Sequence, residues 1–144
     1  MHIKSLAGAL PIMLGHPQKL TPTDLKKYRG FAAWLQLMDN HYEIMSFRQD
    51  LDGFGEPMEG MWDGFQRINT ETKAGGIIGV FRHGAVENNR LVIVYYLQPD
   101  KKNFVKDMEG KVIAKQTGNS LKIKEFEVML KNIYDGVLYE LSTE

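Results

Sequence analysis

The stretch "TPTDLKKYRGFAAWLQLMDNHYEIMSF", residues 21–47, contains the clearest helix signal of the chain and the point at which its pattern changes. Thr21 is typical of an N-cap, Pro22 suits the first helical position, and Asp24 lies near the positive end of the helix dipole. Apolar residues then recur at spacings of three and four up to Met38, which predicts an amphipathic helix.

The apolar face of this predicted helix is wide. A face of this width must pack against a large surface, which can be the rest of the chain, another domain or a second copy in a homodimer. If no such surface covers it, part of the face should be exposed to solvent. The residues of the face are Leu25, Tyr28, Phe31, Ala32, Trp34, Leu35 and Met38.

After His41 the apolar pattern changes to a period of two or to continuous β-branched and aromatic runs, and it does not change back. The predicted fold class is therefore mainly β, an antiparallel β-sandwich of about eight strands preceded by one α-helix. The run "LVIVYYL", residues 91–97, does not alternate and is predicted to be a central strand covered on both faces. The candidate strands are residues 42–47, 64–69, 75–83, 90–97, 103–108, 111–116, 120–123, 126–130 and 136–141.

The composition limits the classes of function. A chain of 144 residues has the size of one domain with a real core. Eighteen basic and eighteen acidic side chains give a formal net charge of zero, which disfavours nucleic acid as a partner. The sequence contains no cysteine, so disulfides and thiolate metal sites are excluded, while the cellular localisation stays unknown. The longest apolar runs are far shorter than the roughly 20 residues that span a bilayer, so no membrane association is expected.

The sequence shows no metal-binding or cofactor-binding motif. His2, His16, His41 and His83 are scattered without the spacing of metal ligands, so no metal site is predicted. The glycines of "AGGIIG", residues 74–79, match neither a Walker A loop nor a dinucleotide-binding turn, and a strand follows them. No cofactor is therefore predicted.

A run of carboxylates precedes the second half of the chain. A glycosidase needs a pair of carboxylates, and this run contains enough acids to supply one. The glycines and Pro57 between the acids are typical of a solvated loop, which is the interpretation that we favour. No catalytic residue is therefore assigned. The acids are Asp50, Asp52, Glu56, Glu59 and Asp63.

The segment "EGMWDGFQRIN", residues 59–69, combines acids with aromatic side chains. An aromatic ring can stack on a sugar ring while neighbouring polar groups bond its hydroxyls. The alternative is that the aromatic side chains fill the core, and we favour this for Phe65, Tyr95 and Tyr96. Trp62 follows a polar glycine loop, so Trp62 and Asp63 are the candidate substrate-binding residues.

Five segments follow one another along the chain in a specific order: "ALPIMLGHPQKL" at 9–20, the predicted helix at 21–38, "WDGFQRIN" at 62–69, "GGIIGVFRHGA" at 75–85 and "YDGVLYELS" at 134–142. In the order and the local sequence of these segments, the chain resembles the C-terminal end of an α-galactosidase (melibiase)-like glycoside hydrolase. In that family a catalytic (β/α)8 barrel is followed by an antiparallel β-sandwich domain.

The resemblance implies that the chain has two parts. Residues 1–42 would be a strand-loop-helix remnant of the last β/α unit of a barrel, with Gly15 and His16 in the loop that faces the mouth of the active site. Residues 43–144 would be the β-sandwich domain. The catalytic aspartates of the family lie on earlier barrel strands, so no catalytic residue is transferred to this sequence.

The leading functional hypothesis is an accessory β-sandwich fragment of an α-galactosidase-like glycoside hydrolase, inactive alone. Its partner would be the catalytic barrel of the parent protein, which the sandwich stabilises through an apolar contact. Carbohydrate is a second expected partner. The alternative is a free-standing carbohydrate-binding module that binds through exposed aromatic side chains. A small complete enzyme that uses the acidic run is a third option.

Overall fold

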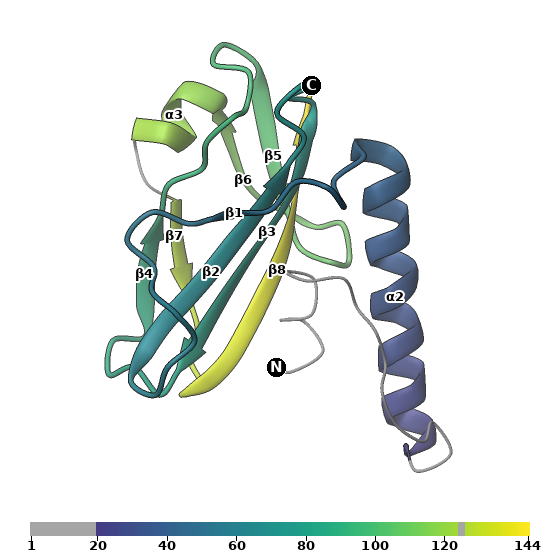
Figure 1. Cartoon of the computed structure of the whole chain (residues 1–144), viewed down its shortest axis with the longest axis vertical. Coiled ribbons are helices and arrows are strands. Elements are labelled where there is room, and N and C mark those ends of the chain that lie inside the picture. The colour runs from purple at the N-terminus through teal and green to yellow at the C-terminus, as the bar shows by residue number, and fades with distance from the viewer. Residues whose placement is uncertain (1–19, 124–125) are drawn as a thin grey trace.

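The computed structural model describes residues 20–123 and 126–144, which are arranged in three layers. A long helix packs on one face of a six-stranded sheet, and a two-stranded sheet covers the other face (Figure 1). The prediction of a mainly β fold, with one main helix before eight antiparallel strands, is confirmed.

Helix α2 (Pro22–Tyr42) begins at the predicted residue. The side-chain oxygen of Thr21 accepts a hydrogen bond of 3.1 Å from the backbone N–H of Asp24, so Thr21 is the N-cap. The first turns extend beyond the end of the sheet (Figure 1). For this reason the buried stripe is narrower than predicted and lies in the second half of the helix, at Phe31, Leu35, Met38 and Tyr42.

The predicted strand at residues 42–47 is wrong, because α2 continues to Tyr42 and residues 43–48 form a turn and not a strand. Tyr42 is buried one turn beyond Met38, and its hydroxyl donates a hydrogen bond of 2.6 Å to Glu140. Glu43 then ends the helix in a left-handed conformation, with φ of 54°. Burial against the sheet therefore extends the helix past the point at which the sequence pattern changes.

Six strands form the main sheet: β1 (Gln49–Asp50), β2 (Met61–Ile68), β3 (Gly75–His83), β5 (Lys102–Lys106), β6 (Val112–Thr117) and β8 (Tyr134–Thr143). Their order in space is β1-β2-β3-β8-β5-β6, and every neighbouring pair is antiparallel. The predicted strand at residues 75–83 coincides with β3, which is buried at every position except its last. β3 and β8 are thus the centre of the sheet.

Two short strands, β4 (Asn89–Val92) and β7 (Phe126–Met129), form the second sheet. The predicted central strand at residues 91–97 is wrong, because β4 ends at Val92 and belongs to this smaller sheet. Three of its four residues are exposed, and Val92 is fully buried while Leu91 is 50% exposed. The strand is therefore not covered on both faces, as its apolar sequence suggested.

Helix α3 (Gly118–Ile123) takes the place of the strand predicted at residues 120–123. The side-chain oxygen of Thr117 accepts a hydrogen bond of 3.1 Å from the backbone N–H of Ser120, which favours a helical turn. Leu121 is fully buried in the core between the two sheets. The turn chemistry at Gly118 therefore starts a short helix instead of joining two strands.

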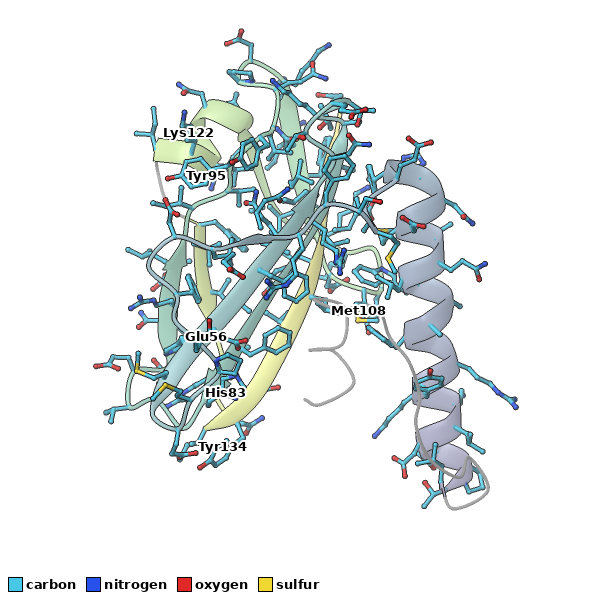
Figure 2. The ribbon with its side chains drawn as sticks, in the orientation of Figure 1. Glu56, His83, Tyr95, Met108, Lys122 and Tyr134 are labelled. Atoms are coloured by element: carbon cyan, nitrogen blue, oxygen red, sulfur yellow. The ribbon has the colours of Figure 1, made fainter. Side chains whose placement is uncertain are left out.

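Each face of the main sheet carries its own apolar core. Ile78 and Val80 of β3 pack between the two sheets, whereas Ile77 and Phe81 pack on the opposite face against α2. Met108 lies between the sheet and the helix (Figure 2). The helix therefore folds back on the sheet. The buried residues of this core are Phe31, Leu35, Met38, Tyr42, Ile44, Phe65, Ile77, Phe81 and Leu138.

The strand and loop expected in residues 1–19, with Gly15 and His16, lie outside the described residues. The division of the chain at residue 42 stays a prediction. Within the described residues, α2 and the main sheet share one apolar core. No helix in this part of the chain is long and apolar enough to cross a membrane.

Candidate functional site

The candidate residues Trp62 and Asp63 occupy opposite faces of β2, because successive side chains alternate across a strand. Trp62 is 6% exposed and packs in the core between the two sheets. Its Nε1 atom is buried and makes no hydrogen bond with the described residues. The structure therefore does not bring the two side chains together, and their contact with sugar stays a prediction.

Asp63 meets His83 on the face of the sheet that carries α2. The register of β2 and β3 places Asp63 opposite Phe81, so that His83, two residues further along, projects from the same face. Asp63 Oδ1 lies 2.7 Å from His83 Nε2. A carboxylate and an imidazole at this distance can share or transfer a proton.

A cleft of about 290 Å³ lies beside this pair, between β2 and the loop that follows β1. Asp63 and Glu56 line it together with the ring of Phe54, and Figure 2 shows Glu56 and His83 in the same part of the molecule. Arg48, also in the lining, forms an exposed ion pair of 2.7 Å with Asp50. Carboxylates, a guanidinium and an aromatic ring are groups that bind sugar hydroxyls and ring faces.

The acidic run is a solvated loop over most of its length, as predicted. Asp52, Glu56 and Glu59 are exposed in the loop between β1 and β2. Asp63, by contrast, lies on β2 with a side chain that is only 17% exposed. Its contact with His83 holds this carboxylate against the sheet.

Burial raises the pKa of Asp63 above its ordinary value. The hydrogen bond from His83 and the positive charges of His83 and Arg48 act in the opposite direction, but they do not cancel the effect of burial. The ionised form of Asp63 is thus less favourable in the folded protein than in water.

The Asp63→Asn variant should reveal this shift as a pH dependence of stability. In the unfolded chain Asp63 ionises near its ordinary pKa of 3.8, whereas in the folded chain its pKa is higher. Between the two values the folded state binds more protons than the unfolded state, so the contribution of Asp63 to the free energy of unfolding falls as pH rises. The variant should therefore gain stability relative to the wild type across this window. Urea unfolding of both proteins from about pH 4 to 8 measures the difference in their free energies of unfolding. If the variant loses stability relative to the wild type as pH rises, the pKa of Asp63 is not raised in the folded protein.

The sequence prediction missed His83 as a partner of Asp63. The sequence did contain a signal for this pairing, because the predicted strands at 64–69 and 75–83 are consecutive and a short turn joins them. Pairing them as a hairpin places Asp63 and His83 at the same end of the sheet. Among the described residues no group of histidines and acids could hold a metal ion.

Comparison with known proteins gives similarity at the level of the fold. No protein-family model and no curated protein matches the sequence. The structure is similar to GH36 alpha-galactosidase AgaB from Geobacillus stearothermophilus, with a TM-score of 0.70 and 15% identity over 89% of this chain and 17% of that chain. The chain shares its fold with the C-terminal region of GH36 alpha-galactosidases.

Two further solved structures agree. The galactosidase domain of alpha-galactosidase-sucrose kinase AgaSK has a TM-score of 0.67 and 14% identity over 89% of this chain and 17% of that chain. The alpha-galactosidase from Lactobacillus brevis has a TM-score of 0.68 and 12% identity over 90% of this chain and 18% of that chain. The resemblance found in the sequence is confirmed, and the chain spans about a sixth of the length of these enzymes.

Proposed function

We propose that this chain is the accessory C-terminal region of an α-galactosidase-like glycoside hydrolase, which stabilises a catalytic barrel and does not hydrolyse glycosides alone. The observation that carries the proposal is the match in fold. It extends over 89% of this chain but only 17% of AgaB, so the rest of such an enzyme lies outside the matched region.

The geometry of the cleft supports the absence of independent hydrolysis. Most glycosidases place two carboxyl groups on either side of the bond that is cleaved, with one acting as acid and the other as base or nucleophile. In this cleft Asp63 is hydrogen-bonded to His83, and Asp50 is exposed and paired with Arg48. Glu56 lies in an exposed loop, and no hydrogen bond or ion pair within residues 20–123 and 126–144 fixes it opposite Asp63.

The outer side of α2 supports contact with a further domain. Leu37 is 60% exposed although the helix is packed on its other side, and Trp34 is only partly buried. An apolar contact of this kind between the helix and a barrel would anchor the sandwich. Pairing of two copies through the same side of α2 stays the alternative prediction, and light scattering across a range of protein concentrations distinguishes a monomer from a dimer.

A hydrolysis assay tests the proposed inactivity. The purified chain should release no nitrophenol from nitrophenyl α-galactoside or from the corresponding β-galactoside above the rate of a blank without protein. Turnover that disappears in Asp63→Asn would contradict the proposal and would favour the small complete enzyme. Turnover that persists in this variant would indicate a contaminating hydrolase.

The proposed sugar contacts of Trp62 and Asp63 need separate controls. Trp62→Ala removes a buried ring, so it should cost about 3–5 kcal/mol of stability whether or not Trp62 meets a ligand. Asp63→Asn keeps the shape of the side chain and is the better probe. Titration with galactose, followed by tryptophan fluorescence, should show weaker binding to this variant if Asp63 accepts a hydrogen bond from a sugar hydroxyl.

A further inference from the structure

A second cavity, of about 310 Å³, lies at the opposite end of the sandwich from the Asp63 cleft. Tyr95 and Tyr96 form one wall, and Asn119 and Lys122 of α3 form another. Lys73, from the loop between β2 and β3, completes the rim. Figure 2 shows Lys122 next to Tyr95. This cavity takes no part in the proposed function.

The backbone beside the cavity is fixed by a buried side chain. Gln66 of β2, which is 1% exposed, accepts a hydrogen bond of 3.1 Å from the N–H of Tyr95 and donates one of 3.3 Å to its carbonyl oxygen. The hydroxyl of Tyr95 also donates a hydrogen bond of 2.6 Å to Asp52. Tyr95 is thus held at both its main chain and the tip of its side chain, which prepares the wall of the cavity before any ligand arrives.

Tyr96 has an unusual conformation for a bulky residue. Its φ of 66° lies in the left-handed region, and its side chain is 50% exposed. Left-handed backbone at a bulky residue costs about 1–3 kcal/mol and is concentrated at functional sites. The conformation presents an aromatic ring to solvent beside Tyr95, with the two ring centroids 6.2 Å apart.

The side chains of the cavity select a class of ligand. Its described lining residues include two lysines and no carboxylate. Asp52, which accepts the hydrogen bond from Tyr95, lies outside the lining. The Nζ atom of Lys122 lies 5.9 Å from the centroid of the Tyr95 ring. The volume is at the small end of the range for ligand pockets, which fits a single ring. An exposed tyrosine can stack on such a ring, and Asn119 can bond its hydroxyls.

We infer that this cavity, termed the Tyr95–Tyr96 pocket, binds a hydroxylated six-membered ring that carries a negative charge, as in a uronic acid or a sugar phosphate. Tyr96 stacks on the ring, and Lys73 and Lys122 neutralise the charge. The inference does not depend on the proposed hydrolase context.

Calorimetric titration with glucuronate, glucose 6-phosphate and glucose tests this pocket. At least one of the two anions should bind at least tenfold more tightly than glucose, and the tighter anion identifies carboxylate or phosphate as the charged group. Lys122→Met should reduce this preference. Equal binding of glucose and both anions, or no binding of any of the three up to about 10 mM, would overturn the inference.

Tyr96→Gly separates ligand binding from folding. Glycine adopts left-handed backbone without strain, so the variant should keep or raise the melting temperature while binding of the anion weakens at least tenfold. Tyr134→Ala is the matched control, because Tyr134 is a tyrosine that is 57% exposed outside this pocket, and its loss should leave the affinity unchanged. Full binding by Tyr96→Gly would overturn the inference.

Discussion

The Arg82→Met variant should lose about 3–5 kcal/mol of unfolding free energy, because Arg82 is buried and its side chain bonds two backbone segments, residues 85–86 and 130–132. Its Nε atom donates to the carbonyl oxygen of Ala85 at 2.8 Å, Nη1 donates to that of Leu130 at 2.9 Å, and Nη2 donates to that of Val86 at 3.0 Å. Methionine fills similar space but donates nothing, so the buried carbonyls of Ala85 and Leu130 would lose their partners. Urea unfolding monitored by circular dichroism measures the loss.

Arg29→Met is the matched control for this variant. Arg29 is exposed on α2, and arginine and methionine have similar helix propensity, so the change should stay within about 0.5 kcal/mol. Equal effects of the two substitutions would show that the bonds made by Arg82 do not hold the loops around β3 and β7 in place.

The Gly75→Ala variant should lose about 3 kcal/mol or more, because two independent features exclude a side chain at this position. Gly75 has φ of 132°, which residues with a side chain rarely adopt. An added Cβ would lie 2.1 Å from the carbonyl oxygen of Leu141 on β8 and 2.9 Å from the ring of Tyr42. The change therefore forces apart β3, β8 and the end of α2. Thermal unfolding should show a large fall in melting temperature, and a fall of less than about 2 °C would contradict this packing.

Gly30→Ala should have the opposite sign. Gly30 lies inside α2, and an added Cβ would have no described atom within 4 Å apart from its chain neighbours and the nearby backbone of the helix itself. Alanine loses less backbone entropy than glycine in a helix, so the variant should gain about 0.5–1 kcal/mol. The same unfolding measurement checks both glycine variants, and destabilisation by Gly30→Ala would indicate that α2 packs closely against another surface at this position.

Local sequence chemistry predicts the elements whose own residues determine them. Thr21 and Pro22 mark the start of α2, and the uncharged run "IIGVF" at residues 77–81 marks the centre of the main sheet. The errors occur where tertiary burial decides the structure. Tyr42 stays helical because it packs on the sheet and bonds Glu140, and Leu121 lies in a short helix because its side chain fills the core between the sheets.

The candidate site was predicted only in part. Asp63 was found from its residue type and its neighbours, but His83 depends on the register of β2 and β3, which single residues do not specify. Trp62 was a candidate because a polar loop precedes it, whereas the strand directs its ring into the core. The pocket at Tyr95 and Tyr96 depends on Gln66, whose side chain bonds the backbone of Tyr95. The two residues are 29 positions apart in the sequence, and no sequence pattern connects them.

The proposed role of this chain is to serve a catalytic barrel with α-galactosidase-like activity. To test it, the protein is given an affinity tag in its native host, purified under mild conditions and assayed with nitrophenyl α-galactoside. Hydrolysis should co-purify with the tag, whereas the recombinant chain alone should show none. If homogeneous tagged protein from the native host releases no nitrophenol from this substrate, the proposed role is wrong.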